Sequence, residues 1–249
     1  MQRYFTDKLK DNVFTLNNDD YYHIKTVMRM NECDNIEVVY QKEVYLCSLE
    51  FNDNNIIIHK EKKVDSKELL NKEIILVIPL LKETKMDYIL QKATELGVTK
   101  IIPVEMERSI IKLDKGKEEK RIERWTRICK EASEQSMRVT IPVITEVKKL
   151  TELSDIDGAK MLCSTVEKQN TIKMFLQSIK NYDRIIIVVG PEGGISPKEE
   201  ALLNKQGFIS VTLGNRIMRV ETAPLFVLST INYEFMEWYY GWITWKCKK

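Results

Sequence analysis

The feature that most constrains the fold of this chain is a series of continuous apolar runs that alternate with amphipathic segments from about residue 70 onward. Ile74-Ile-Leu-Val-Ile78 is apolar at every position, and Arg184-Ile-Ile-Ile-Val-Val189 is apolar after its first residue. Strands of this kind are typical of a parallel sheet that helices cover on both faces. Between these runs, at residues 86–96 and 117–137, apolar residues recur at the spacing of a helix. The sequence therefore predicts an α/β fold with a mainly parallel sheet, with further strands at 98–104, 159–163 and 208–213.

The first 70 residues follow a different pattern. Alternating or β-branched runs occur at 36–40, 44–51 and 56–59, with turn-prone residues between them. They predict a small antiparallel barrel or meander. The charged stretch Lys60–Lys67 is the candidate linker, so that we expect one domain at 1–70 and a second at 71–249.

Composition narrows the function classes. No apolar run is long enough to span a membrane, and the first residues lack the apolar core of a signal peptide, so we expect a cytoplasmic protein. The five cysteines are scattered and only two histidines occur, which disfavours a metal site. The net charge is +2, so binding of a nucleic acid would depend on local clusters of basic residues.

Glycines follow two of the predicted strands. The strand at 184–189 runs into Gly190-Pro-Glu-Gly-Gly194, and Ser196, Pro197 and Glu199 then have the pattern of a helix start. Ligands of open α/β sheets bind at the carboxyl ends of strands. The turn has neither the GxGxxG pattern nor a following Lys-Ser/Thr, so it favours a neutral or cationic ligand over a polyphosphate. The alternative interpretation is a tight turn without a ligand.

The next strand, 208–213, also ends in a glycine loop. Gly214 opens this loop, and Arg219 and Glu221 lie near its end beside the apolar Ile217 and Met218. Both loops are expected at the same edge of the sheet. Arg219 and Glu221 are candidates for a reaction site, and a surface ion pair is the alternative.

Together these residues resemble the 16S rRNA (uracil-N3)-methyltransferase family of the SPOUT superfamily. The motifs that carry the resemblance run in order along nearly the whole chain: Arg3-Tyr-Phe5, His23-Ile-Lys-Thr-Val-Met-Arg29, Gln91-Lys-Ala-Thr-Glu-Leu-Gly-Val98, Glu107-Arg-Ser109, Glu131-Ala-Ser-Glu-Gln-Ser-Met-Arg138, Gly190-Pro-Glu-Gly-Gly194 and Leu213-Gly-Asn-Arg-Ile-Met-Arg-Val-Glu-Thr-Ala223. Met218 stands where the family more often has Leu. The tail Trp238–Lys249 is more aromatic than the family pattern, and we assign it no function.

The resemblance implies a PUA-like RNA-binding β-barrel followed by a SPOUT domain, whose C-terminal part forms a trefoil knot. It also implies a homodimer and S-adenosylmethionine as the cofactor. Carried over by position, the expected contacts to the cofactor are Ser164, Gly190, Pro191, Glu192, Gly193, Gly194, Leu213, Gly214, Ile217, Met218, Arg219 and Ala223.

The implied reaction methylates N3 of a uridine in 16S ribosomal RNA, presented either as naked RNA or in the 30S subunit. N3 loses a proton, which leaves negative charge on the neighbouring carbonyl oxygens, and a cation stabilises that charge. Arg219 is the first candidate for the cation and Arg138 the second, while Glu221 would orient an arginine or act as a base. Expected RNA contacts are Arg3, Arg29, Arg108, Gln135 and Arg138. His23 is expected to be a packed or capping residue.

Two alternatives stay open at this point. The chain could be a SPOUT methyltransferase that acts on a ribose 2′-hydroxyl or on another base. It could also be a catalytically silent RNA-binding protein that acts in ribosome assembly. The sequence does not identify the residue that takes the N3 proton.

Overall fold

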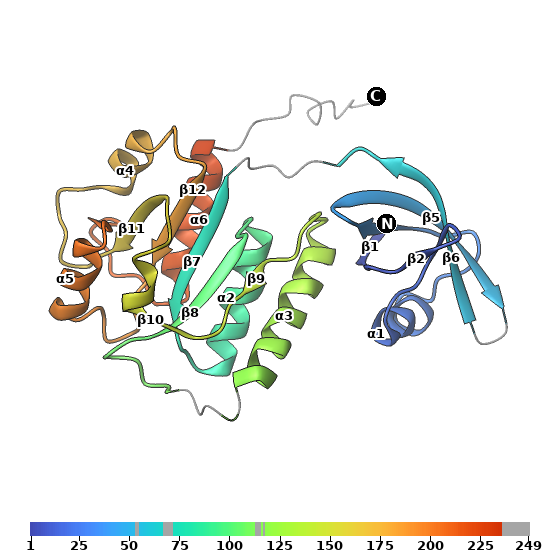
Figure 1. Cartoon of the computed structure of the whole chain (residues 1–249), viewed down its shortest axis with the longest axis horizontal. Helices are drawn as coiled ribbons and strands as arrows, with labels where there is room; N and C mark the ends of the chain where they lie inside the picture. The colour runs from blue at the N-terminus through green and yellow to red at the C-terminus, as the bar shows by residue number, and fades with distance from the viewer. Residues whose placement is uncertain (53–54, 67–71, 113–115, 117, 236–249) are drawn as a thin grey trace, which may run out of the picture.

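Two β-sheets organise the chain in the computed structural model, which describes residues 1–52, 55–66, 72–112, 116 and 118–235. One sheet is built from the N-terminal residues and the other from residue 73 onward, and helix α3 (Glu118–Gln135) lies between them in Figure 1. The aromatic tail 238–249 lies outside the described residues, as does the end of the expected linker, Lys67.

The N-terminal sheet has six strands in the order β1-β4-β5-β6-β3-β2. Their bounds are β1 Gln2–Phe5, β2 Leu9–Lys10, β3 Val13–Phe14, β4 Asn35–Tyr40, β5 Glu43–Asn52 and β6 Asn55–Val64. The three strands expected from the sequence are present as β4, β5 and β6. Gln41 and Lys42 join β4 to β5 with positive φ angles of 50° and 64°, as a tight hairpin turn requires.

Two expectations for this region were wrong. The sheet is not purely antiparallel, because β1 pairs with β4 in parallel. The charged stretch from Lys60 is strand up to Val64 rather than linker. Its alternating charges mimic a linker in the sequence, but β5 supplies backbone partners along almost the whole of β6. Short helices complete this part of the fold: α1 (Asn18–Tyr22) and the π-helix η1 (His23–Val27).

The second sheet has seven strands, and every pairing within it is parallel. The strand order is β10-β8-β7-β12-β11-β13, with β9 paired to β8. The bounds are β7 Glu73–Pro79, β8 Lys100–Glu105, β9 Val143–Ile144, β10 Lys148–Lys149, β11 Ala159–Cys163, β12 Arg184–Val188 and β13 Ile209–Val211. The predicted mainly parallel α/β sheet is confirmed.

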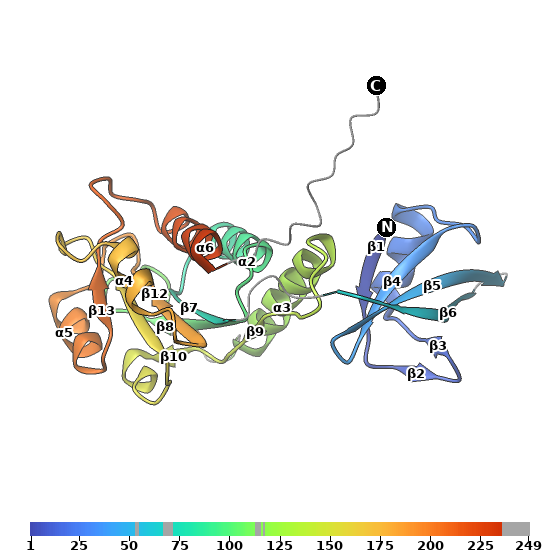
Figure 2. The same ribbon diagram turned by 90° about the horizontal axis from the view of Figure 1, so that it is seen from above.

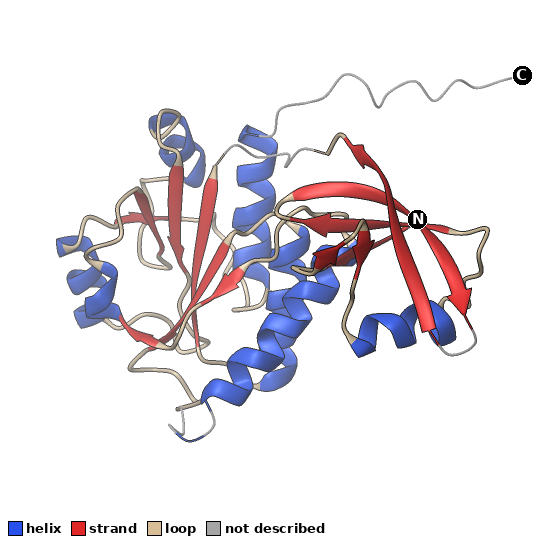
Figure 3. Ribbon diagram, turned by 45° about the vertical axis from the view of Figure 1, so that its right-hand side comes forward, coloured by secondary structure: helices blue, strands red, loops and turns tan. Residues whose placement is uncertain are grey.

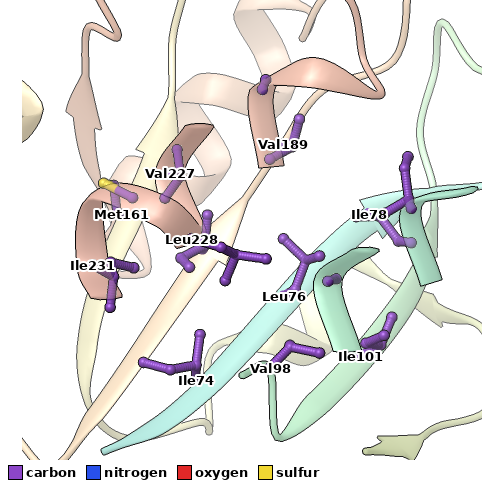
Figure 4. Packing of buried hydrophobic residues seen from close by; sticks show 14 of the residues in the cluster. Ile74, Leu76, Ile78, Val98, Ile101, Met161, Val189, Val227, Leu228 and Ile231 are labelled. Carbon is purple, nitrogen blue, oxygen red and sulfur yellow. The ribbon is translucent and has the colours of Figure 1, made fainter. Parts of the chain in front are cut away.

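Helices cover both faces of this sheet, which explains why β7 is apolar throughout. Ile74, Leu76 and Ile78 pack into one core with helices α2, α3, α4 and α6, while Ile75 and Val77 belong to the core on the other face. Figure 4 shows the first of these cores, with Val227, Leu228 and Ile231 of α6 beside β7. The helices are α2 Glu83–Glu95, α4 Ile172–Ser178, α5 Pro197–Lys205 and α6 Thr222–Phe235. The 3-10 helix η3 (Leu150–Leu153) and α5 lie on the second face, as Figure 2 shows.

Local signals in the sequence correctly marked two helix ends. Gly97 follows α2 with a φ of 89°, a left-handed conformation that glycine adopts without strain. Ser196 caps α5: its hydroxyl accepts from the Glu199 amide at 3.3 Å, and the Glu199 carboxylate accepts from the Ser196 amide at 3.0 Å. Within the described residues, no helix is both long and apolar enough to cross a membrane.

Buried charged groups join the two sheets through α3, the helix that lies between them in Figure 3. Arg3 of β1 is 5% exposed and pairs with Glu37 of β4 at 2.6 Å. Its guanidinium also donates to the backbone carbonyls of Met137 and Arg138, just beyond α3. Lys130 of α3 pairs with Asp20 of α1 at 2.6 Å. These contacts hold the N-terminal sheet in one position against the second sheet.

Candidate active site

Three loops meet where neighbouring parallel strands end. Strand β11 lies between β12 and β13, so the carboxyl ends of all three strands reach the same edge of the sheet. Ser164 follows β11, Gly190 follows β12 shortly after its end, and Gly214 follows β13. The two glycine loops expected at one sheet edge are therefore there, with the β11 loop between them.

The three loops enclose a cavity of about 390 Å³. This volume falls within the range of roughly 300–1,000 Å³ that is usual for small-molecule sites. Eleven of the twelve residues expected to contact the cofactor line it: Ser164, Gly190, Pro191, Glu192, Gly194, Leu213, Gly214, Ile217, Met218, Arg219 and Ala223. Gly193 is the exception, because it faces Arg108 instead.

The first glycine turn is tight, and its shape requires glycine. Gly194 has a φ of 72°, and its amide donates to the Pro191 carbonyl at 2.8 Å, which closes the turn. A Cβ at Gly190 would lie 2.6 Å from Cγ1 of Ile195, so a side chain there would push Ile195 out of place. The absence of side chains leaves backbone groups of the turn at the cavity wall, where a ligand can approach them closely.

The second loop carries side chains that solvent reaches. Gly214 adopts a φ of 114°, and Ile217 is 86% exposed although its side chain is entirely apolar. An isolated exposed apolar side chain is common, but this one lines a cavity, where a ligand would cover it. Met218 is half-buried against the main core of the sheet.

The end of β11 contributes a thiol to the cavity, and the loop after it contributes a buried polar residue. The Ser164 hydroxyl accepts from the amides of Val166 and Glu167 at 3.2 and 3.3 Å and thereby shapes this loop. Burial raises the pKa of the Cys163 thiol to about 12. The thiol is therefore protonated at neutral pH, and it serves as part of the cavity wall rather than as a nucleophile.

An ammonium group links the two glycine loops. Lys85, in the first turn of α2, lies 2.8 Å from Glu192 of the first turn and 3.3 Å from Glu221 of the second loop. The pKa of Lys85 is raised, mainly by the hydrogen bond that Lys85 donates to Glu192. Partial burial works to raise the pKa of Glu192, but Lys85 and a backbone hydrogen bond outweigh it and hold that pKa below its ordinary value.

Among the three catalytic candidates, the structure brings two together. Arg219 and Glu221 lie at the second loop with 4.0 Å between Nη1 and Oε1, and the Arg219 side chain is 84% exposed. Arg138 does not line the cavity. It is 7% exposed, and its guanidinium donates at 2.8 and 2.7 Å to the carbonyls of Thr94, in the last turn of α2, and of Val98, just after it. Arg138 therefore lies apart from the other two candidates, and its role as a catalytic cation stays a prediction.

The expected RNA contacts fall into two groups. Arg29, Arg108 and Gln135 are exposed, although Arg108 also donates to the Gly193 carbonyl at 3.0 Å and so supports the first glycine turn. Arg3 and Arg138 are buried: Arg3 is paired with Glu37, and Arg138 donates to backbone carbonyls. His23 packs in the N-terminal sheet, with Nδ1 2.9 Å from the Tyr4 hydroxyl, and it follows α1 as its C-cap.

Several cavity residues were missed by reasoning from the sequence. They are Lys85, Cys163, Thr165, Val166, Lys168, Val189, Ile195, Glu200, Asn215, Arg216 and Val220. Most adjoin predicted residues, so proximity along the chain could have identified them. Lys85 had no such signal, because it lies 107 residues from Glu192. Within the described ranges, no group of three or more His, Cys, Asp or Glu residues is arranged to hold a metal ion.

Comparison with known proteins shows similarity along most of the chain. A family model described as an RNA methyltransferase domain matches residues 68–232. The ribosomal RNA small subunit methyltransferase E of Bacillus subtilis is 36% identical over 249 residues, which cover 94% of this chain and 97% of the relative. The protein of that name from Mesomycoplasma hyopneumoniae is 37% identical over 232 residues, with 92% and 98% covered.

Solved structures have the same fold. A ribosomal RNA small subunit methyltransferase E from Neisseria gonorrhoeae, bound to S-adenosyl methionine, superposes with a TM-score of 0.79 at 27% identity, covering 94% of this chain and 98% of that one. A putative methyltransferase from Legionella pneumophila superposes with a TM-score of 0.81 at 24% identity, covering 93% and 96%, and supports the fold alone.

Proposed function

Because the chain belongs to the family of ribosomal RNA small subunit methyltransferases E, we propose that it transfers a methyl group from S-adenosylmethionine to N3 of a uridine in 16S ribosomal RNA. The observation that carries the proposal is the cavity where the loops after β11, β12 and β13 meet. Eleven residues that the family pattern assigns to the cofactor line this one cavity, although they come from three separate segments of the chain.

The cavity wall carries charged groups of both signs, as a cofactor with an ammonium, a carboxylate and a sulfonium requires. The carboxylates of Glu192 and Glu200 attract a sulfonium or an ammonium. The basic side chains of Lys168, Arg216 and Arg219 attract a carboxylate. Apolar side chains of Leu213, Ile217 and Met218 would pack on the adenine ring, while backbone groups beside Gly190, Gly194 and Gly214 would hold its polar edge. Gly193 would not contact the cofactor itself and would act by maintaining the shape of the turn.

The bound cofactor supplies a methyl carbon on a sulfonium; N3 loses its proton and bonds that carbon, and the carbon–sulfur electron pair stays on the departing thioether. The chain's own residues position the uracil and stabilise charge. Arg219 reaches into solvent beside the cavity, which suits contact with the carbonyl oxygens of an incoming base. Glu221, 20% exposed and held by Lys85, orients Arg219. Glu221 or a water molecule would accept the N3 proton.

We assign RNA contacts to the exposed residues Arg29, Arg108 and Gln135. Arg3 and Arg138 would serve RNA binding indirectly. Arg3 holds β1 to the residues just beyond α3, and Arg138 holds those residues to the end of α2, so that together they set the spacing between Arg29 and the cavity. A uridine inside a ribosomal helix would have to leave its stack to reach the cavity. An activity on ribosomal RNA implies a cytoplasmic location.

The architecture is proposed to follow the family as well. Residues 1–70 would form a PUA-like RNA-binding barrel, and residues 71–249 a SPOUT domain whose glycine loops belong to a trefoil knot. The separate core of the N-terminal sheet supports this division. A homodimer is supported by large side chains exposed on the outer helices: Tyr88 on α2, and Phe226 and Tyr233 seven residues apart on α6.

Methyl-transfer assays with 16S RNA, 30S particles and transfer RNA test the proposal, followed by mapping of the methylated position. We expect labelled methyl groups at N3 of a uridine in 16S RNA. Methylation at a ribose 2′-hydroxyl or at another base would refute the specificity and keep the enzyme class. Failure to bind S-adenosylmethionine at millimolar concentration would identify a silent RNA-binding protein.

A further inference from the structure

Lys85 is a cavity residue that neither the family pattern nor any sequence motif assigned. It extends from the first turn of α2, a helix outside the three loops, and its Nζ lies within 3.3 Å of carboxylates from two of them. The partners, Glu192 and Glu221, are separated from Lys85 by 107 and 136 residues. Such a contact exists only in the folded chain.

The three side chains are partly shielded from water. Lys85 is 32% exposed, Glu192 is 35% exposed and Glu221 is 20% exposed. Glu221 Oε2 lies in reach of Lys85 for an ion pair but accepts no hydrogen bond within the described part of the chain. The ion pair with Lys85 is therefore the closest compensation of this carboxylate, which adjoins Val220 of the cavity wall. Arg219 lies at 4.0 Å and points largely into solvent, so it screens Glu221 weakly.

The charges of these side chains affect the donor and the product of methyl transfer differently, because the cofactor loses a positive charge in the reaction. S-adenosylmethionine carries a sulfonium, whereas the thioether product S-adenosylhomocysteine is neutral at sulfur. Carboxylates beside the cavity favour the cationic donor over the neutral product. Because the transition state has already lost part of the sulfonium charge, too strong a preference for the donor slows transfer.

We propose that Lys85 is a positioning residue that balances charge at the methyl-transfer site: it holds Glu192 and Glu221 together and limits the preference of the cavity for a sulfonium over a thioether. The proposal rests on the proposed function. Lys85 keeps the carboxylates of both glycine loops in fixed positions, which leaves them available to orient Arg219 without imposing two uncompensated negative charges on the donor.

Calorimetric titration with S-adenosylmethionine and S-adenosylhomocysteine tests the proposal without any turnover. The two ligands share their adenosine, amino and carboxylate groups, so the ratio of their affinities isolates the effect of the sulfonium. We expect Lys85→Met to raise this ratio in favour of the donor about tenfold, which equals ~1.4 kcal/mol. Lys85→Arg retains the charge and should retain the ratio. The kcat of Lys85→Met should fall while its KM for the donor stays the same or falls.

Two further variants separate charge from structure. Glu192→Gln should lower the ratio, and Lys85→Met combined with Glu192→Gln should return it towards that of the unsubstituted chain. Lys198→Met is the matched control, because it removes an exposed lysine six residues beyond Glu192 that does not line the cavity. An exposed ion pair contributes only about 0–1 kcal/mol to folding, so the melting temperature of Lys85→Met should change little.

Each outcome has a distinct meaning. An unchanged ratio in Lys85→Met, with both ligands bound, would overturn the role of Lys85 and leave the methyltransferase proposal intact. Equal weakening of both ligands would also overturn it and reduce Lys85 to a structural ion pair. If the unsubstituted chain binds neither ligand, the proposed function fails, and this inference fails with it.

Discussion

Arg3 and Glu37 face each other across the parallel strand pair β1–β4 and form an ion pair of 2.6 Å that is almost fully withdrawn from solvent. The side chains are 5% and 11% exposed. Because the Arg3 guanidinium also donates to the carbonyls beyond α3, this pair connects the register of the N-terminal sheet to the position of the second sheet. Arg3, which is an expected RNA contact from the sequence, is thus part of a buried contact between the two sheets.

Glu37→Gln should destabilise the chain by about 3 kcal/mol, or roughly 6–12 °C in Tm, because it leaves the Arg3 charge buried without a counter-ion. Scanning calorimetry measures the change. The control is Glu43→Gln, which removes the partner of Lys63 in an ion pair with side chains 43% and 57% exposed. A loss of less than about 1 kcal/mol is expected there. Equal losses of folding stability in the two variants would show that the buried pair contributes no more to stability than the exposed one.

Glu134 should make folding stability depend on pH. Burial raises the pKa of this carboxyl from 4.5 to about 7, although Lys130, 3.0 Å away, acts in the opposite direction. A carboxyl with a higher pKa in the folded chain favours folding in its protonated form. Its contribution is therefore complete below pH 4.5 and is lost as the pH rises through about 7.

Glu134→Gln should remove this dependence. Relative to the unsubstituted chain, the variant should gain up to about 3 kcal/mol of stability between pH 4.5 and about pH 8. Denaturant unfolding over a series of pH values measures the difference. Glu131→Gln, an exposed position on the same helix, should give a curve parallel to that of the unsubstituted chain. If Glu134→Gln is parallel as well, the carboxyl does not titrate as described.

Arg219→Ala should lower turnover by about 10²–10³-fold, the usual loss when one group that stabilises a developing anion is removed. Donor affinity should change little, because the side chain is 84% exposed and the other cavity residues remain in place. Single-turnover methyl transfer together with calorimetry separates the two effects. Arg127→Ala, an exposed arginine on α3, is the control. Unchanged turnover in Arg219→Ala would exclude Arg219 from the reaction.

Gly190→Ala should weaken donor binding about tenfold, equivalent to ~1.4 kcal/mol. The added Cβ would lie 2.6 Å from Cγ1 of Ile195, a residue that lines the cavity, so Ile195 must move. Titration calorimetry with S-adenosylmethionine measures the effect. Gly116→Ala is the control, because a Cβ there meets no atom within 4 Å. Wild-type affinity in Gly190→Ala would mean that Ile195 and the turn adjust without affecting the ligand.

Much of the fold could be predicted because its signals are local. A strand buried on both faces must be apolar at successive positions, and Ile74–Ile78 shows this directly. The capping box of Ser196 and Glu199 lies within four residues, and the left-handed Gly97 ends α2. The cavity could be predicted to the same degree, because the residues at the carboxyl end of a parallel strand necessarily lie at one edge of the sheet.

The positions of charged groups could not be predicted in this way. A strand with alternating charges resembles a linker in the sequence, and Lys60–Val64 became part of β6 because β5 lies alongside it. Arg138 looks like a catalytic or RNA-binding arginine until the carbonyls of Thr94 and Val98 are seen around it. The role of a charged side chain depends on its exposure and its partners, and neither is a local property.

By itself, then, the sequence determined the parallel sheet, the helix ends and the residues that follow each strand, because backbone conformation and apolar periodicity depend on near neighbours. Only the tertiary structure decided which arginines are buried, that β11 lies between the two glycine loops, and that Lys85 meets Glu192 and Glu221. Those facts depend on contacts between residues far apart in the sequence: 34 positions for Arg3 and Glu37, 44 for Arg138 and Thr94, and 107 for Lys85 and Glu192. Such contacts are set when the helices pack on the sheet.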